Sequence, residues 1–348
     1  MDPCWLIVAL WVDGIGLGQA PPRLLGAHQL ERVNAGLHGR LLDFTHNHGH
    51  DRRLWSPSLH QRRDLYVYVP PGFDPGRKYP MSIFLHGAAQ DEQFFLQTQV
   101  TQFDRAISQG EMPPAIIVAP DGSIHGRATL LQPASFWANS RAGNFEDYVM
   151  ADVWNFMMES FPIRPEREAH ALVGGSMGGS AAFALAIKHR NRVKVAMGFM
   201  PLLNLRYGDC RGKYRSRFEP DCYALRDRIR GMESLGRRRL FNLTFNDLFA
   251  PLFGRGPQAI AGISSINPIE LMVQHDLRNG ELDLFVAYGG KDEFNVQAQV
   301  ESFLYAAHER GIEVTTAYDP NGKHDLSTGL RLMPQAMRWA AEREQKGQ

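Results

Sequence analysis

The chain has 348 residues, of which 44% are hydrophobic and 22% are charged, and its formal net charge is +1. This composition is ordinary for a folded globular protein, and the small net charge excludes bulk attraction to nucleic acid or acidic lipid as the basis of function. No apolar run reaches the length of about 18 residues that a membrane span needs. We therefore expect one domain over residues 21–348, with no membrane span and no nucleic-acid partner.

The first twenty residues have features of an export signal. Residues 5–12 form a short apolar run, and Gly18-Gln19-Ala20 has the small residues of a cleavage site. On the other hand, Asp2 precedes the apolar run without any lysine or arginine, and Pro21 follows the cleavage site. We interpret residues 1–20 as a signal peptide of a secreted or periplasmic protein. A misassigned start or a disordered tail on a cytoplasmic protein is the alternative.

Residues 21–63 are rich in Arg, His, Gly and Pro, and the stretch 39–44 is expected to add an edge strand. The alternating histidines His46, His48 and His50 would share one face of a strand, so a metal site is one interpretation. No carboxylate or cysteine set with ligand spacing lies nearby. We therefore favour a loop at the substrate-side rim and predict neither a metal nor an organic cofactor.

From residue 63 onward, strand-like and helix-like patterns alternate along the chain. The expected strands are 64–69, 81–86, 115–119, 169–174, 193–199, 282–288 and 313–318. The expected helices are 94–109, 145–160, 178–190, 295–310 and 328–343. This alternation predicts an α/β fold with a mainly parallel sheet and helices on both faces.

The stretch 174–179 (GGSMGG) is the most informative motif. It reads as G-x-S-x-G between the apolar run 169–173 and the helical pattern 180–187. A serine on a sharp turn between a strand and a helix has its hydroxyl lifted clear of the sheet, where it can act as a nucleophile. We predict Ser176 as a catalytic nucleophile.

The segment 201–268 lies between two of the expected strands and is predicted to form a cap or lid. It holds twelve Arg or Lys against six Asp or Glu, which we interpret as a solvated face, with selection of acidic or phenolic substrates as the alternative. The four-residue spacing of Phe241, Phe245, Phe249 and Phe253 predicts one face of a helix, packed on the core or lining a pocket. Within the same segment, Cys210 and Cys222 are expected to form a disulfide, with two free thiols as the alternative.

An acid and a base follow the serine in the order Ser, Asp, His that α/β hydrolases use. Asp292 comes just after the strand 282–288, with Glu293 as the backup acid. His324 lies in the loop after the strand 313–318. We expect Ser176 to attack the acyl carbon, His324 to serve as general base, and Asp292 to orient its ring.

An oxyanion hole needs two backbone N–H groups beside the nucleophile. We assign the first to Met177, which follows Ser176, and the second to Ala88, with Ala89 as the alternative. Both alanines lie in the loop after the strand 81–86. His86 precedes the serine in the chain, so it is expected to hold this loop by hydrogen bonds.

At these residues the chain resembles the putative-esterase family of α/β hydrolases, which includes esterase D, feruloyl esterases, acetyl-xylan esterases, enterochelin esterases and mycolyltransferases. The matching pieces are 64–73 (DLYVYVPPGF), 85–87 (LHG), 119–122 (APDG), 135–137 (SFW), 146–148 (EDY), 174–179 (GGSMGG), 290–292 (GKD) and 323–324 (KH). From these pieces we assign His86, Gly87 and Trp137 to substrate binding. The segment 201–268 and the Ala-Ala-Gln sequence after His86-Gly87 depart from the family pattern.

The resemblance implies a serine carboxylic-ester hydrolase that needs no metal or organic cofactor. We expect a small or carbohydrate-linked ester as its substrate. A peptidase of the prolyl-oligopeptidase kind uses a similar serine motif, and an acyltransferase would use the same acyl-enzyme. A non-catalytic binding module on the same scaffold is a fourth interpretation, which the presence of all three catalytic residue types disfavours.

Overall fold

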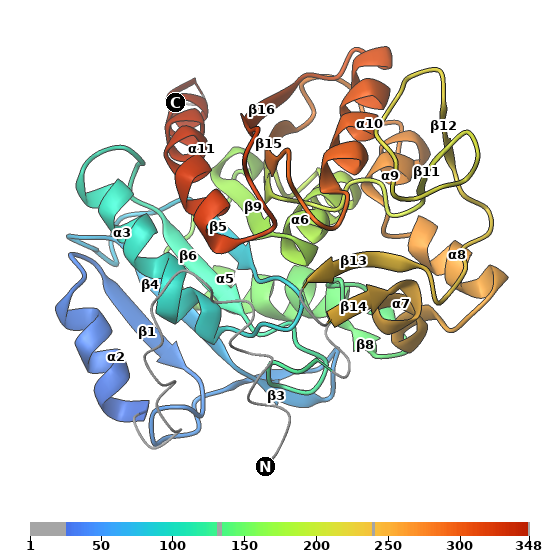
Figure 1. Ribbon diagram of the computed structural model, residues 1–348. Coiled ribbons are helices and arrows are strands. Elements are labelled where there is room, and N and C mark those ends of the chain that lie inside the picture. The colour runs from blue at the N-terminus through green and yellow to red at the C-terminus, as the bar shows by residue number, and fades with distance from the viewer. Residues whose placement is uncertain (1–25, 131–133, 239–240, 347–348) are drawn as a thin grey trace.

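The computed structural model describes residues 26–130, 134–238 and 241–346 (Figure 1). The signal peptide predicted for residues 1–20 lies outside the described residues. Within the described ranges, no helix combines the length and the apolar character that crossing a membrane requires.

The centre of the molecule is an eight-stranded sheet with the order β1-β4-β6-β5-β9-β10-β15-β16. β4 pairs antiparallel with β1 and with β6, and every other neighbouring pair is parallel. The strands are β1 (Arg40–Phe44), β4 (Leu65–Val69), β5 (Met81–Leu85), β6 (Ile116–Pro120), β9 (His170–Gly175), β10 (Val195–Phe199), β15 (Asp283–Gly289) and β16 (Val314–Asp319). The predicted mainly parallel α/β-hydrolase sheet is thus confirmed.

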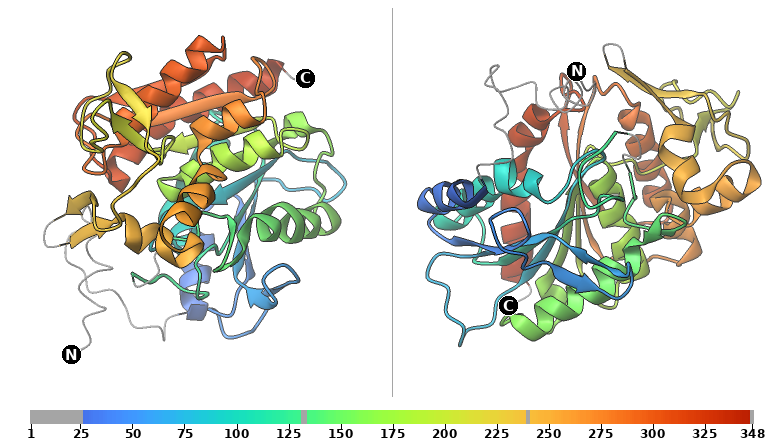
Figure 2. Two further views of the ribbon diagram at one scale, coloured as in Figure 1. Left: turned by 90° about the vertical axis from the view of Figure 1, so that its right-hand side faces the viewer. Right: turned by 90° about the horizontal axis from the view of Figure 1, so that it is seen from below.

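Helices cover both faces of this sheet, as Figure 2 shows in the view from below. One face carries α2 (Gly26–Ala35), the π-helical turn η3 (Phe95–Gln99) with α3 (Val100–Ser108), and α11 (Leu326–Lys346). The other carries α5 (Trp154–Ser160), α6 (Met177–Lys188) and α10 (Val296–Glu309). Strands β4, β5 and β6 are buried at every residue, because helices enclose a parallel sheet on both sides.

The predicted elements agree with the structure to within about two residues at most ends. The predicted helix 145–160 is a composite of α4 (Phe145–Asp147), the π-helical turn η4 (Tyr148–Val153) and α5. Sequence periodicity missed α2 and two short hairpins, namely β2 (Leu54–Ser56) with β3 (Gln61–Arg63) and β7 (Asn139–Ser140) with β8 (Gly143–Asn144). The strands of the two hairpins have only two or three residues each, which is too few to show a period.

The segment 201–268 follows β10 and lies beside α10 (Figure 1). It contains two hairpins and two short helices. The hairpins are β11 (Tyr207–Asp209) with β12 (Tyr223–Leu225), and β13 (Ser234–Arg238) with β14 (Phe241–Thr244). The helices are α7 (Phe245–Phe253) and α8 (Pro257–Ser264), and α9 (Pro268–Gln274) begins at the end of the segment. The predicted disulfide between Cys210 and Cys222 is present.

The expectation that four phenylalanines share one helix was wrong at its first member. Phe241 belongs to strand β14, whereas Phe245, Phe249 and Phe253 lie in α7. The helix starts where Thr244 and Asp247 form a capping box, with the Thr244 amide donating to the Asp247 carboxylate at 2.8 Å. The capping residues therefore fixed the start of the helix, although the phenylalanine spacing continued across it.

Candidate active site

Ser176 occupies the turn between β9 and α6. Its backbone has φ 53° and ψ −119°, a conformation that non-glycine residues rarely adopt and that costs about 1–3 kcal/mol. Two glycines let the strand and the helix meet closely at this turn. A Cβ on Gly178 would lie 1.9 Å from the carbonyl oxygen of Leu85, and one on Gly174 would lie 2.4 Å from the Gly178 backbone. The glycines therefore allow the contact that holds Ser176 in this conformation.

A continuous hydrogen-bonded chain joins Ser176, His324 and Asp292. His324 Nδ1 lies 2.7 Å from Asp292 Oδ2, and His324 Nε2 lies 2.8 Å from Ser176 Oγ. Because a carboxylate only accepts, Nδ1 carries the proton of the neutral ring, and Nε2 accepts the proton of the serine hydroxyl. The His324 and Asp292 side chains are 4% and 0% exposed. The structure thus brings together the three residues that the sequence predicted from their order.

Glu293, the backup acid, is used differently. Its carboxylate accepts the backbone N–H of His324 at 3.0 Å rather than the ring N–H. The two loops that carry the acid and the histidine are also joined through their backbones. Gly290 N donates to Asp319 O at 2.9 Å, and Lys291 N donates to Gly322 O at 2.8 Å. These bonds extend the β15–β16 pairing beyond the sheet edge and hold Asp292 opposite His324.

The loop after β5 lies beside Ser176 and carries the candidate oxyanion donors. Gly87 N donates to Gln90 Oε1 at 2.8 Å, so the Gln90 side chain closes the loop on itself. Ala89 takes a positive φ of 58° at this bend. Ala88 and Met177 both line a pocket together with Ser176. The oxyanion assignment to Met177 and Ala88 remains a prediction. The role of Gln90 could not be foreseen, since nothing in its spacing distinguishes it from a surface residue.

His86 and Trp137 are not among the residues that line the two pockets beside Ser176, and their assignment to substrate binding stays a prediction. Their side chains are buried at 2% and 0% exposure. Trp137 Nε1 donates to the carbonyl of His86 at 3.2 Å, and His86 Nε2 accepts the backbone N–H of Gly122 at 2.9 Å. Both side chains therefore hold the loop from behind, as expected for His86. Gly87, the third residue of that assignment, does line a pocket with Ser176.

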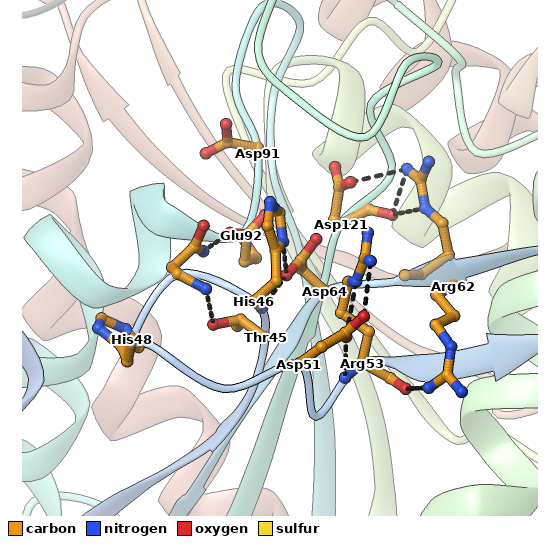
Figure 3. A network of polar contacts seen from close by, with 12 residues as sticks. Thr45, His46, His48, Asp51, Arg53, Arg62, Asp64, Asp91, Glu92 and Asp121 are labelled. Carbon is orange, nitrogen blue, oxygen red and sulfur yellow. Dashed lines mark hydrogen bonds and ion pairs between the residues drawn. The ribbon is translucent and has the colours of Figure 1, made fainter. Parts of the chain in front are cut away.

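Figure 3 shows a network of acidic and basic side chains that includes Asp64, Glu92 and Asp121. Arg63, fully buried, pairs with Asp121 at 2.9 Å, and the Asp121 amide donates to the carbonyl of Asp64. Glu92 is 4% exposed and accepts a bond from Asn47 Nδ2 at 2.7 Å. Burial, and then the surrounding carboxylates, raise the pKa of Glu92 well above its ordinary value.

The histidines considered for a metal site belong to the edge of the same network. His46 Nδ1 lies 2.7 Å from Asp64 Oδ1 (Figure 3). His48 Nε2 lies 2.7 Å from the Tyr66 hydroxyl. In the part of the chain that the structure describes, no three His, Cys, Asp or Glu side chains are arranged to hold a metal ion. The loop that carries His46, His48 and His50 was expected at the substrate-side rim, but its residues line neither pocket beside Ser176.

Two apolar pockets meet at Ser176 and His324. The first, the cap-side pocket, lies between residues 201–268, here called the cap segment, and the nucleophile. Its walls are mainly aromatic and aliphatic, and they include Phe136, Tyr214, Phe245, Leu248, Phe249 and Phe294. Phe136 and Phe249 stack with ring centroids 4.9 Å apart. The second pocket lies between η3 with α3 and the start of α11, and its lining includes Phe94, Phe103, Leu330 and Met333.

Of the arginines in the cap segment that the structure describes, none lines the cap-side pocket. Arg226 is 6% exposed and pairs with Glu233, and its guanidinium lies 4.9 Å from the ring centre of Phe245. Arg206 pairs with Glu270 at 2.6 Å. These two arginines therefore stabilise the cap from behind its aromatic wall.

The cap segment also bonds directly to the loop that carries Asp292. The Tyr214 hydroxyl donates to the carbonyl of Phe294 at 2.6 Å, and Asn295 Nδ2 donates to the carbonyl of Tyr214 at 2.6 Å. Arg215 donates to the carbonyl of Glu293. The Phe294 ring in turn meets His324 edge to face at 4.8 Å. Cap, acid loop and histidine thus form one packed unit.

The sheet, the strained serine turn and the Ser–His–Asp chain together define a serine hydrolase of the α/β-hydrolase class. The family model described as Putative esterase matches residues 56–328, and the chain belongs to this family.

Similar proteins agree with this class. A solved ferulic acid esterase has a TM-score of 0.64 at 16% identity, covering 88% of this chain and 99% of that chain. An S-formylglutathione hydrolase from Agrobacterium tumefaciens has a TM-score of 0.61 at 16% identity, covering 88% and 96%. The Endo-1,4-beta-xylanase Y of Acetivibrio thermocellus is 28% identical over 145 residues, which make up 40% of this chain and only 13% of that relative.

Proposed function

We propose that this protein hydrolyses carboxylic esters that carry a bulky apolar or aromatic acyl group. The cap-side pocket supports this proposal. Its phenylalanine and leucine walls suit an apolar or aromatic acyl group. Among the similar proteins, this feature agrees with the name ferulic acid esterase more than with S-formylglutathione hydrolase. The match to part of a xylanase is consistent with an ester carried by a plant-wall polysaccharide.

In the proposed mechanism, Ser176 Oγ attacks the acyl carbon while His324 Nε2 takes the hydroxyl proton. The carbonyl oxygen becomes negatively charged and accepts hydrogen bonds from the Met177 and Ala88 amides. His324 then gives its proton to the leaving alcohol as the C–O bond breaks, which leaves an acyl-enzyme on Ser176. A water molecule, deprotonated by His324, releases the acid and restores the serine.

We place the acyl group in the cap-side pocket, because both candidate oxyanion donors line that pocket with Ser176. The alcohol would then lie toward the pocket between α3 and α11. A carbohydrate alcohol would extend from there into solvent, and a hydrophobic alcohol would fill the pocket.

The first experiment compares wild type, Ser176→Ala and Ser108→Ala on p-nitrophenyl acetate, butyrate and octanoate and on methyl ferulate. We expect Ser176→Ala to lose about a thousandfold or more in kcat, as removal of a nucleophile does. Ser108 is an exposed serine at the end of α3 and serves as the matched control, whose loss should have no effect. If wild type hydrolyses none of these esters, the esterase proposal fails. Labelling of Ser176 by a fluorophosphonate would then separate a peptidase from a binding module.

We further propose that the protein works in an oxidising compartment outside the cytoplasm. The Cys210–Cys222 disulfide supports this, because structural disulfides persist mainly in exported proteins. Mass spectrometry of the protein purified from its native source shows whether Cys210 and Cys222 are oxidised and whether the predicted signal peptide has been removed. Reduced Cys210 and Cys222 together with an intact N-terminus would contradict the proposal.

A further inference from the structure

The face of the sheet that carries α3 and α11 contains a cavity that the proposed reaction does not use. It encloses about 400 Å³, within the range of about 300–1,000 Å³ that is usual for small-molecule sites. Phe103, Val173 and Phe199 line both this cavity and the second pocket beside Ser176. Neither Ser176 nor His324 lines it, so it is a separate space behind the catalytic site. We call it the α3–α11 cavity.

The floor of the α3–α11 cavity is the sheet itself. Val195, Met197 and Phe199 alternate along β10, so their side chains point to the same face. At about 3.3 Å per residue, this row spans about 13 Å. On the opposite side, Met337 and Ala340 of α11 lie three residues apart and also line the cavity. The cavity therefore runs along the strands, and it suits an elongated ligand.

Four methionines form much of the apolar wall. They are Met81, Met112, Met197 and Met337, and each is at most 8% exposed. A methionine side chain is unbranched and has three rotatable bonds, so it adapts its shape to the surface of an apolar partner. A wall of this kind suits a flexible alkyl chain.

The charged side chains of the lining all lie at the end of the cavity where the strands begin. They are Arg164, Glu168, Lys194, Asp283 and Arg343. Each of the first four is paired with an opposite charge at 3.1–3.9 Å. The charges of these four are therefore balanced within the protein.

Arg343 is the exception. It is partly exposed, and its guanidinium lies 5.5 Å from the ring centre of Trp339. It forms no ion pair with any residue that the structure describes. A guanidinium keeps its charge at every physiological pH, and it binds a carboxylate through two parallel hydrogen bonds. The cavity thus combines an apolar interior with a cation that can take an external anion.

We propose that the α3–α11 cavity binds the anion of an unbranched fatty acid, with the alkyl chain along β10 and the carboxylate on Arg343. An alcohol of the same length would leave Arg343 without a counter-ion. A carboxylate without a chain would leave the methionine wall unfilled. This site goes beyond the proposed function, because its ligand is not the ester that is cleaved at Ser176.

The first experiment is a calorimetric titration of the wild type with octanoate, decanoate and dodecanoate. We expect the affinity to rise by up to about fourfold for each added methylene while the chain still fits the cavity. If none of the three binds, or if their affinities do not depend on length, the proposal is wrong. The titration does not use ester hydrolysis, so its failure would leave the proposed function standing, and a protein inactive on esters could still bind the fatty acid.

The second experiment tests the contact with Arg343. Arg343→Gln should weaken decanoate by about tenfold and leave decan-1-ol within about twofold, since only the carboxylate uses the charge. Arg338→Gln is the matched control, because Arg338 is an exposed arginine of the same helix that does not line the cavity. Equal affinity of decanoate for Arg343→Gln and wild type would overturn the placement of the carboxylate.

The third experiment narrows the cavity. Ala340→Phe places a ring in the lining and should weaken both decanoate and decan-1-ol by about tenfold or more. Ala341→Phe, on the next residue of the helix and outside the lining, should change neither. Thermal melting shows whether each variant is folded, and Arg343→Gln alone decides if Ala340→Phe is not. Undiminished binding of decanoate to folded Ala340→Phe would show that it occupies another site, such as the pockets beside Ser176, and would refute the proposal.

Discussion

Replacement of Asp292 by asparagine tests the assignment of the acid through a specific change in protonation. Asp292 Oδ1 accepts the backbone N–H of Phe294 at 2.9 Å, and Oδ2 accepts the ring N–H of His324 at 2.7 Å. In Asp292→Asn the backbone N–H can still only donate, so the amide oxygen must face Phe294. The amide N–H₂ then faces His324 Nδ1, which must become an acceptor, and the ring proton moves to Nε2 opposite Ser176.

When Nε2 carries the ring proton, it has no lone pair to accept the proton of the serine hydroxyl. A doubly protonated ring would in addition lack the carboxylate that stabilises its positive charge. We therefore expect kcat to fall by about 10³- to 10⁴-fold, equal to about 4–5.5 kcal/mol of transition-state stabilisation. KM should change little, because Asp292 is buried away from the substrate. The assay is p-nitrophenyl butyrate hydrolysis, with circular dichroism to show that the variant is folded.

Glu293→Gln is the matched control for this prediction. The glutamine oxygen can still accept the His324 backbone N–H that Glu293 accepts now, so the loss should be less than about tenfold. If Asp292→Asn retains activity within tenfold of wild type, or if Glu293→Gln loses as much as Asp292→Asn, the reasoning from hydrogen-bond donors and acceptors is wrong.

The remaining predictions concern stability. Gly178→Ala should destabilise the fold by about 3–5 kcal/mol in urea unfolding, because its Cβ would lie 1.9 Å from a backbone oxygen. Gly175→Ala, whose Cβ meets nothing closer than 3.9 Å, should change stability by less than about 1 kcal/mol, and equal effects would contradict the close-contact argument. Replacing Cys210 and Cys222 by serine should cost up to about 3 kcal/mol for a separation of 12 residues, so an unchanged melting temperature would show that this loop does not limit unfolding. Folding raises the pKa of Glu92 above its unfolded value of about 4.5. The contribution of protonated Glu92 to stability is therefore fully present below pH 4.5, and it is lost as the pH rises through the folded pKa. Glu92→Gln should therefore gain stability over wild type between pH 5 and pH 8, and a constant difference would indicate that Glu92 is ionised in the folded protein.

The sequence was sufficient for the sheet and for the three hydrogen-bonded residues, because both leave a pattern along the chain. Long strands and helices repeat with fixed periods, and Ser176, Asp292 and His324 follow strands in a fixed order. The sequence left Glu293 as a backup for Asp292, since adjacent carboxylates in a loop differ only in the direction they point, and the structure shows that Asp292 faces the His324 ring.

The other features depend on contacts between distant segments. Gln90 and Gln299 are ordinary glutamines in the sequence, and only folding brings one beside Gly87 and the other into the pocket wall. Trp137 belongs to a family motif, but a motif does not tell which side of a loop a ring faces. The prediction that a helix begins near Phe241 was wrong because a capping box at Thr244 starts the helix at Phe245. In the sequence this capping box is only a threonine and an aspartate three residues apart.

The bonds between the cap segment and the loop of Asp292 have a consequence for engineering this protein. An exchange of the cap for one from another esterase would replace Tyr214 and Arg215, which together hold the carbonyls of Phe294 and Glu293. The donor cap would then shape the new pocket and, at the same time, release the acid from its position opposite the histidine. Chimeras that carry the acid loop along with the cap should therefore keep their turnover, whereas those that exchange the cap alone would lose it even with a well-formed pocket.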